Sequence, residues 1–365
     1  MIPQNKNLFF IIILTGLIIL ILYQSNSELY SYGQRIKTVF YQPEEKNISL
    51  STDNWIYPDE DLTKNLPSVF CLIKTHPNNI KINKTLNIYK VWARKCDNYR
   101  FITLLPEHLR PKNSSETFEV FENFYMIQPK GLVRESHGDL SLKVYYSMIY
   151  AYQKFKPYDW YYIADDDAYV NMRNLKEFLK DKSTNESITY GYNFKVIVKD
   201  GYHSGGPGYV LSNAAFTTMT QKMIENINNC PNSGIDDVDI SSCVRKYNGK
   251  KGKSIDEQGR ERWLVMSLMT HFTGTYGGWL DGYAENPPRK GLNCCADNLI
   301  AVHYMSPRDV FRLDLAIEVQ KNVLKLYDNY LKIGKNVTFK NIFKNYVLLE
   351  DIENDSNKYK ELVNF

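Results

Sequence analysis

The stretch Asp159–Val170, DWYYIADDDAYV, decides the fold of this 365-residue chain. Trp160 to Ala164 is a short aromatic and apolar run, which predicts a buried β-strand. Asp165, Asp166 and Asp167 follow that run without a break. Because ligands bind at the carboxyl ends of strands in open α/β sheets, the acidic triplet marks a candidate site.

The triplet has the chemistry of a divalent metal site. Three neighbouring carboxylates repel one another when all are ionised, and a bound cation removes that cost. Aspartate oxygens suit Mg²⁺ or Mn²⁺, and such a cation can neutralise a diphosphate leaving group. The alternative is a solvated acidic turn that caps the helix expected after Asn171.

Strand-type runs and helix-type periodicities alternate on both sides of this stretch. The alternation predicts an α/β fold with a largely parallel, Rossmann-like sheet. The folded domain is expected over residues 67–330, followed by a polar tail over 331–365. The predicted strands are Val69–Ile73 and Arg100–Leu104, and the predicted helices are Asn83–Lys95, Leu140–Phe155 and one that begins at Asn174.

The N-terminus predicts a membrane anchor. Leu8 to Tyr23 carries no charge, and the polar residues up to Ser27 extend it, which predicts a transmembrane signal anchor over residues 8–27. Residues 1–7 would form a short cytosolic tail, and residues 28–66 a polar stem. A cleaved signal peptide is the alternative, and in both cases the remainder of the chain would face the lumen.

The cysteine content agrees with a lumenal chain. The six residues are even in number, which suggests disulfides, although the pairing stays open at this point. A zinc site is less consistent, since no C-x-x-C pair occurs. The net charge of +4 and the lack of a dense basic run give no case for nucleic-acid binding. The cysteines are Cys71, Cys96, Cys230, Cys243, Cys294 and Cys295.

Three further groups of residues could carry chemistry. Asp237, the second acid of GIDDVDISSCV, could act as a general base, or could instead cap the helix expected over Val238–Val244. His303 could complete a metal site with the aspartates, although a lone histidine is more often structural. The turn from Gly205 to Gly208 lacks the lysine pattern of a phosphate-binding loop, and its glycines would allow close approach to a ligand.

The order of these motifs resembles glycosyltransferase family 31, and within it the core 1 galactosyltransferase group. The resemblance covers about residues 67–320. The vicinal cysteines and the glycine-rich turn are most similar to the core 1 group. The motifs that carry the resemblance are CLIKT (71–75), VWARKC (91–96), DWYYIADDDAYV (159–170), YGYNFK (190–195), GYHSGGPGYVLS (201–212), DDVDISSCV (236–244) and CCADNLIAVHY (294–304).

The resemblance implies a GT-A nucleotide-sugar-binding fold and an enzyme held as a single-pass type II protein in the Golgi membrane. It implies inverting, Mn²⁺-dependent transfer of galactose from UDP-galactose to O3 of GalNAc on Ser or Thr of glycoproteins. It also implies a homodimer, a possible dedicated chaperone, and disulfides between nearest-neighbour cysteines.

The resemblance also implies roles for individual residues. Asp167 and His303 would hold Mn²⁺ with Asp165 alongside, and Asp237 would be the base. The donor nucleotide would lie near Lys74, Thr75, Lys143, Asp166 and Tyr304, and the acceptor near Trp279, Tyr283, Gly205 and Gly206.

The chain departs from the group's pattern in two segments, residues 134–143 and 262–284, which would contact donor or acceptor. A fringe-like N-acetylglucosaminyltransferase is therefore one rival. A non-catalytic chaperone and a lumenal lectin are the others, but the retained acidic triplet, Asp237 and His303 favour an enzyme.

Overall fold

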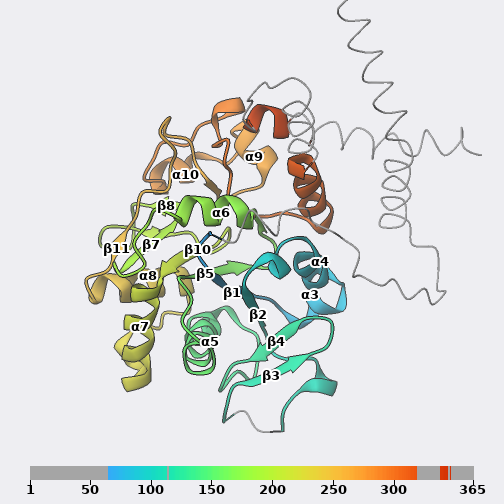
Figure 1. Cartoon of the computed structure of the whole chain (residues 1–365), viewed down its shortest axis with the longest axis vertical. Helices are drawn as coiled ribbons and strands as arrows, with labels where there is room; N and C mark the ends of the chain where they lie inside the picture. Colours follow the sequence, from blue (N-terminus) through green and yellow to red (C-terminus); the bar gives the residue numbers. More distant parts are fainter. Residues whose placement is uncertain (1–64, 113–114, 319–337, 344–345, 347–365) are drawn as a thin grey trace, which may run out of the picture. The chain divides into compact units, whose positions relative to one another are not determined.

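The computed structural model describes residues 65–112, 115–318, 338–343 and 346 (Figure 1). All of these described residues belong to one compact unit. No helix in this described part is both long and apolar enough to cross a bilayer. The anchor predicted over residues 8–27, and nearly all of the predicted stem, lie outside the described residues.

An eight-stranded mixed sheet forms the centre of the domain, which confirms the predicted α/β class (Figure 1). Its central strands are parallel, whereas β10 runs antiparallel to both of its neighbours and β3 antiparallel to β4. The order is β11 (Lys250–Lys251), β7 (Ile188–Gly191), β10 (Tyr209–Ser212), β5 (Trp160–Asp165), β1 (Val69–Lys74), β2 (Asn98–Ile102), β4 (Tyr125–Gln128) and β3 (Phe118–Phe121).

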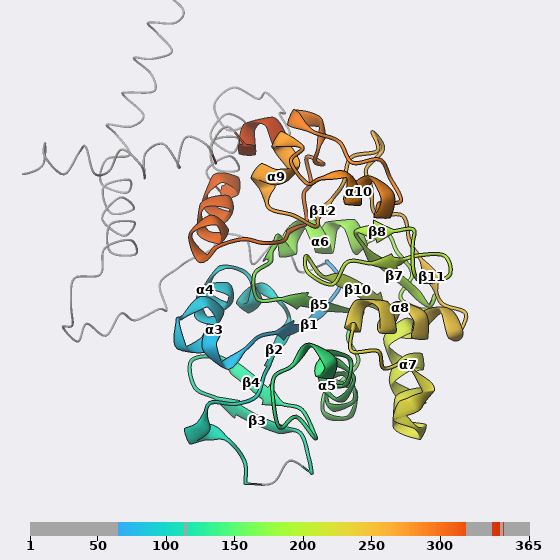
Figure 2. The ribbon, with the colours of Figure 1, turned by 180° about the vertical axis from the view of Figure 1, so that it is seen from behind.

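Alternate residues of each strand point to opposite sides of this sheet, and helices cover both faces. Phe70 and Leu72 of β1 pack with α5 on one face, while Cys71 and Ile73 belong to a second core on the other. Figure 2 shows helices on both sides. The first face carries α5 (Leu140–Lys154), α7 (Asn213–Glu225) and α8 (Asp236–Lys246), and the second carries α4 (Lys84–Val91) and α6 (Met172–Leu179).

A small three-stranded sheet brings the late part of the chain to the end of β5. In it β13 (Ala301–Val302) pairs antiparallel with β6 (Tyr169–Val170) and parallel with β12 (Trp263–Leu264). Val302 lies opposite Tyr169, so the residue after β13 falls beside the acidic triplet that precedes β6.

The remaining elements are short. A hairpin joins β8 (Asn193–Phe194) to β9 (Tyr202–His203), and residues 307–318 and 339–343 are helical. The other helices are α3 (Pro77–Lys81), α9 (Leu268–Thr273), α10 (Gly278–Tyr283) and single 3₁₀ turns at Ala93–Lys95, Glu107–Leu109, His137–Asp139, Ile227–Asn229 and Gly291–Asn293.

The polar tail predicted over 331–365 is wrong for its described residues. Phe339, Ile342 and Tyr346 are buried in the same core as β1 and β5. The Phe343 ring stacks on Phe272, with centroids 3.9 Å apart. Together with Phe343 these side chains recur at the spacing of one face of a helix, a signal that the polar composition around them obscured, and the domain extends through them.

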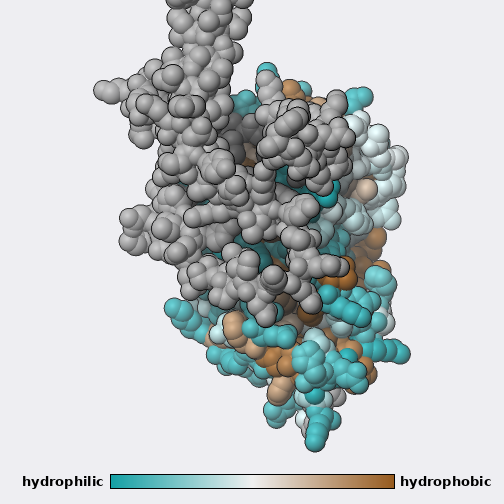
Figure 3. All heavy atoms as spheres, turned by 90° about the vertical axis from the view of Figure 1, so that its right-hand side faces the viewer, coloured by the Kyte–Doolittle hydropathy of each residue, from teal (hydrophilic) through white to brown (hydrophobic). Residues whose placement is uncertain are grey.

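Several large hydrophobic side chains of the described residues are exposed. Three of them, Phe118, Phe121 and Tyr125, lie on the outermost strand pair. Figure 3 shows hydrophobic side chains among polar ones on one face of the molecule.

The three disulfides join nearest-neighbour cysteines, which confirms the pairing implied by the resemblance. They are Cys71–Cys96, Cys230–Cys243 and Cys294–Cys295.

Candidate active site

The carboxyl ends of β1 and β5 form the floor of the candidate site. Lys74 and Asp165 are register partners at these ends. The Lys74 Nζ lies 3.0 Å from Asp165 Oδ1 and 2.9 Å from Asp236 Oδ2, at the first residue of α8. Burial disfavours the charged ammonium, but the two carboxylates outweigh it and raise the pKa of Lys74 above its ordinary value. The ion pairs therefore tie β1, β5 and α8 together.

Asp165, Asp167 and His303 place three possible metal-ligand atoms within 4.8 Å of one another. His303 directly follows β13, whose pairing with β6 carries it to the triplet. Its Nε2 lies 3.0 Å from Asp167 Oδ1 and 3.9 Å from Asp165 Oδ2. The structure thus brings together the three residues that were predicted to bind metal.

The contacts of His303 suit a metal ligand. Its Nδ1 lies 3.2 Å from the carbonyl oxygen of Val265, and a proton on this nitrogen would leave the lone pair of Nε2 directed toward Asp167. Asp167 Oδ1 is buried and has no hydrogen-bond partner. In that tautomer two acceptors would face each other, and a bound cation would relieve their repulsion. One imidazole nitrogen with carboxylate oxygens is a donor set that fits Mn²⁺.

Asp166 points away from this set, toward α3 and α4. Its carboxylate accepts hydrogen bonds from Thr75 Oγ1 at 2.5 Å, from Asn79 Nδ2 at 3.0 Å and from Thr85 Oγ1 at 3.3 Å. The Lys84 Nζ lies 3.5 Å from Asp166 Oδ1. Through these contacts Asp166 fixes α3 and α4 to the sheet. Its contact with the donor nucleotide stays a prediction.

Asp237 stands at the start of α8, beside the glycine-rich turn. Its Oδ2 accepts a 2.8 Å hydrogen bond from the backbone N–H of Gly205. Burial, reinforced by the charge of Asp236, raises the pKa of Asp237 to about 6. A half-buried carboxylate with a pKa near neutrality suits a general base.

Thr75, which directly follows β1, and Lys143 of α5 are both predicted on the donor side, and they contact each other. The Lys143 Nζ donates to the carbonyl oxygen of Thr75 at 2.7 Å and pairs with Glu135 Oε2 at 2.8 Å. Burial lowers the pKa of Lys143, although Glu135 opposes that shift. Lys143 therefore contacts, through the Thr75 carbonyl, the strand end that is predicted to lie near the donor nucleotide.

The glycines of the turn are required by close packing. A Cβ on Gly206 would lie 2.0 Å from the His303 ring, and one on Gly205 would lie 3.0 Å from the Asp237 Cβ. The Tyr162 hydroxyl donates to the carbonyl oxygen of Pro207 at 2.6 Å and fixes the turn. The structure shows these glycines supporting the metal and base residues, and their predicted contact with the acceptor is untested.

An aromatic cluster lies on the side of α10. Trp279 and Tyr283 are both substantially exposed, with ring centroids 5.8 Å apart. Phe194 packs against both of them, and Tyr202 packs against Phe194 at 5.1 Å. Burial, with the charge of Asp237 as the next cause, raises the pKa of Tyr202, so the cluster extends toward the base. Exposed aromatic rings of this kind suit the apolar face of a sugar.

Tyr304 covers His303. The two rings stack with centroids 3.8 Å apart, and the Tyr304 side chain is 57% exposed. Its φ of 51° is uncommon for a residue other than glycine, and such backbone conformations concentrate at functional sites.

Sequence reasoning missed three residues at this site. Lys84 lies beside the triplet, Tyr202 extends the aromatic cluster, and Asp236 pairs with Lys74. Two of them carried a signal in the sequence, since Asp236 is half of an acidic pair and Tyr202 lies in the motif at 201–212, although neither was given a role. Lys84 carried none, and its place at the site depends on residues distant in the chain.

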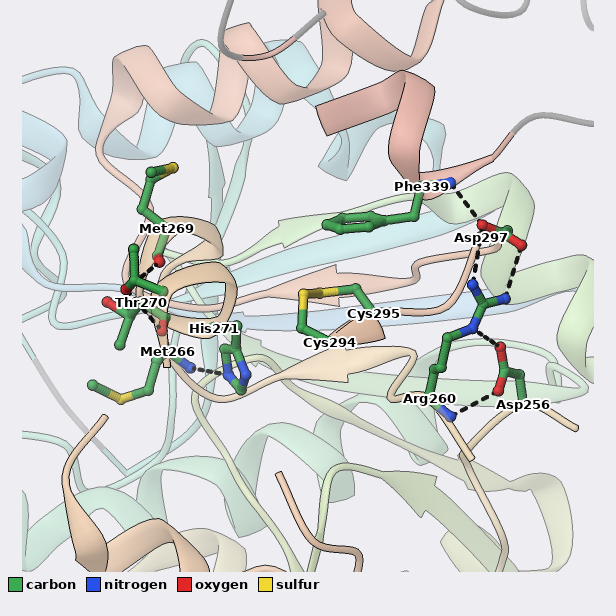
Figure 4. The surroundings of a disulfide bond; sticks show 11 residues. Asp256, Arg260, Met266, Met269, Thr270, His271, Cys294, Cys295, Asp297 and Phe339 are labelled. Carbon is green, nitrogen blue, oxygen red and sulfur yellow. Dashed lines mark hydrogen bonds and ion pairs between the residues drawn. A yellow bond between two sulfur atoms is a disulfide. The ribbon is translucent and has the colours of Figure 1, made fainter. Parts of the chain in front are cut away.

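A cavity of about 410 Å³ lies elsewhere, and none of its lining residues belongs to the predicted site. Figure 4 shows Arg260 between Asp256 and Asp297 at this cavity, near the buried Cys294–Cys295 disulfide. These charges satisfy one another, so the cavity offers no evident chemistry. It is lined by Asn174, Asp256, Glu257, Gln258, Arg260, Arg262, Asp297, Asn298, Ile317 and Ile342.

Comparison with known proteins defines the class as a glycosyltransferase. The galactosyltransferase family model matches residues 132–200. The chain is 29% identical over 288 residues to glycoprotein-N-acetylgalactosamine 3-beta-galactosyltransferase 1 of Xenopus laevis, an alignment that covers 76% of this chain and 71% of the relative. These matches confirm the predicted family resemblance and the prediction of an enzyme.

Other similarities are shorter or more distant. Human chondroitin sulfate synthase 3 is 28% identical over 105 residues, which covers 25% of this chain and 12% of that protein. A solved galactosyltransferase in complex with donor and acceptor sugar analogs is 11% identical with a TM-score of 0.36, covering 65% of this chain and 87% of that one. A glycosyltransferase involved in glycosylation of the major capsid of PBCV-1 is 14% identical with a TM-score of 0.33, covering 69% and 100%.

Proposed function

We propose that this protein is an inverting galactosyltransferase that transfers galactose from UDP-galactose to O3 of GalNAc linked to Ser or Thr on glycoproteins. The observation that carries the proposal is the convergence of the Asp165, Asp167 and His303 set with Asp237 at one edge of the sheet. The relative from Xenopus laevis, whose name specifies a 3-beta-galactosyltransferase acting on glycoprotein N-acetylgalactosamine, supports the choice of donor and acceptor.

Each part of the site has a role in the proposed reaction. A Mn²⁺ ion held by Asp165, Asp167 and His303 would neutralise the diphosphate of the donor. The exposed rings of Trp279 and Tyr283 would pack on the acceptor sugar and orient its hydroxyl.

Asp237 would act as the general base. Its carboxylate takes the proton of the acceptor O3 hydroxyl while that oxygen forms a bond to the anomeric carbon of galactose. The bond from that carbon to the diphosphate breaks, and UDP leaves with the electron pair. Attack from the face opposite UDP inverts the anomeric configuration. The hydrogen bond from the Gly205 N–H fixes the carboxylate in place.

We also propose that the protein acts in the Golgi lumen, held by the apolar segment at residues 8–27. That segment and the even number of cysteines support this location. A homodimer and a dedicated chaperone remain parts of the same proposal.

The test is transfer from a panel of UDP-sugars to a GalNAc-Ser/Thr peptide, with Mn²⁺ and with chelator. We expect metal-dependent transfer from UDP-galactose alone. Transfer from UDP-N-acetylglucosamine would favour a fringe-like enzyme instead. No transfer from any donor by a folded protein would favour the chaperone.

A further inference from the structure

Three lysine ammonium groups surround the acidic triplet and the end of β1, and they differ in what they can still bind. Lys74 is buried between Asp165 and Asp236, at 3.0 and 2.9 Å. Lys143 is buried against Glu135 and a backbone carbonyl, at 2.8 and 2.7 Å. Both ammonium groups are thus enclosed by close partners.

Lys84 is different. Its nearest carboxylate oxygens are Asp166 Oδ1 at 3.5 Å and Asp167 Oδ2 at 3.9 Å, beyond close hydrogen-bond distance. Its side chain is 21% exposed, compared with 6% for Lys74 and 3% for Lys143. Among these three lysines, Lys84 therefore keeps both solvent access and donor capacity next to the metal-ligand set.

The position of Lys84 is also unfavourable for its own helix. It is the first residue of α4, where the helix dipole disfavours a positive charge, and the first turn holds no acidic residue to compensate. Asn83, which caps this helix, has a left-handed φ of 60° and makes no side-chain capping bond. Departures from local preference of this kind concentrate at functional sites.

We infer that Lys84 contacts the diphosphate of the nucleotide-sugar. A dianionic diphosphate drawn to the Asp165, Asp167 and His303 set would lie beside Asp167, within reach of this ammonium. Lys84 would then stabilise the negative charge that develops as UDP leaves. This inference rests on the proposed function, because it requires a nucleoside diphosphate at the site.

The test uses the full-length Lys84→Ala and Lys84→Arg proteins, with Lys90→Ala as the matched control. Lys90 is exposed on the same helix α4. Three quantities are measured: the dissociation constant of UDP with saturating Mn²⁺, that of uridine, and that of Mn²⁺ without nucleotide, from the free-ion electron paramagnetic resonance signal.

We expect Lys84→Ala to weaken UDP binding about tenfold or more, because a charge-assisted hydrogen bond is lost. Uridine binding should not change, and Mn²⁺ should bind at least as tightly as before, because a repelling charge has been removed. Lys84→Arg should restore most of the UDP affinity, and Lys90→Ala should match the unmodified protein.

Two results would overturn the inference while leaving the proposed function intact. One is unchanged UDP affinity in Lys84→Ala. The other is a parallel loss of Mn²⁺, uridine and UDP binding, which would mean that Lys84 only holds the carboxylates in place. If the unmodified protein shows no Mn²⁺-dependent UDP binding, the proposed function itself fails, and the inference with it.

Discussion

Gly206 lies directly against the imidazole of His303. A Cβ at this glycine would fall 2.0 Å from the ring Cε1 and 2.2 Å from Nδ1. The Gly206 carbonyl also accepts a 3.4 Å hydrogen bond from the N–H of Asp165. One glycine therefore touches two of the three residues of the candidate metal set, and it positions them through the backbone alone.

Gly206→Ala should displace the His303 ring and weaken Mn²⁺ binding by at least about tenfold, as losses of supporting contacts at metal sites do. Titration of Mn²⁺ measures the effect. Gly138→Ala is the control, since its Cβ would meet no atom closer than 3.9 Å. Equal Mn²⁺ affinity in the two variants would show that His303 is not a ligand or that its ring is free to move.

Replacing Asp166 or Asp167 with Asn should have different effects on Mn²⁺ binding. Asp167→Asn should lose Mn²⁺ binding. Asp166→Asn should keep it but lower the free energy of unfolding by about 1–3 kcal/mol, because three hydrogen bonds converge on that buried carboxylate. Mn²⁺ titration and urea unfolding of both variants test this, and loss of metal in Asp166→Asn would contradict the assignment.

Activity should fall on the acid side of the Asp237 pKa, which is raised to about 6. The base works as the carboxylate, so kcat/KM for the acceptor should drop about tenfold for each pH unit below 6. Asp237→Asn should reduce kcat by about 100- to 10,000-fold while leaving UDP binding unchanged. A pH–rate profile that stays flat down to pH 5 would exclude this role.

The same pKa shift has a defined sign for stability. The folded-state pKa exceeds the ordinary value of 3.8, so the ionised carboxylate destabilises the fold above about pH 6. That penalty disappears as the pH falls toward 3.8. Asp237→Asn should therefore melt at a higher temperature than the unmodified protein at pH 8, with a smaller difference at pH 5.

Lys74→Ala should destabilise the domain by about 3–5 kcal/mol, because it leaves the buried carboxylate of Asp236 without its counter-charge and removes the partner of the partly exposed Asp165. Lys250→Ala provides the comparison, since its pair with Glu186 is exposed and should contribute at most about 1 kcal/mol. Urea unfolding of both variants measures the difference. Similar losses of unfolding free energy in the two variants would show that the ion pairs of Lys74 are well solvated.

Trp279→Ala should raise the KM for the GalNAc-peptide about three- to tenfold through loss of a ring contact with the sugar. UDP affinity should not change, since Trp279 packs with Phe194 and Tyr283 in the cluster that is predicted to bind the acceptor. Steady-state kinetics with each substrate varied in turn separate the two effects. A selective rise in the KM for UDP-galactose would move this tryptophan to the donor side.

The sequence predicts those parts of the site that are built from residues adjacent in the chain. The strand Trp160–Asp165 and its acidic ending are continuous in the chain, so both the strand and the candidate ligands are visible there. The helix at Leu140–Lys154 and the strand at Val69–Lys74 likewise lie within a residue or so of their predicted positions.

The parts that the sequence could not predict depend on distant contacts. The residues adjacent to Asp166 in the chain do not indicate that its carboxylate points toward Asn79 and Thr85 and away from the candidate metal ligands. The sheet was also expected to be more uniformly parallel, whereas β10 reverses direction between β5 and β7. That reversal depends on which strands are neighbours, which the order of elements along the chain does not fix.

The burial of Phe339 has a consequence for how the protein is made. Its ring fills the core that contains β1 and β5, and its N–H donates to Asp297 (Figure 4). A ribosome must therefore synthesise nearly the whole chain before this core can close. Until then Phe272 lacks the ring of Phe343 that stacks on it in the folded domain.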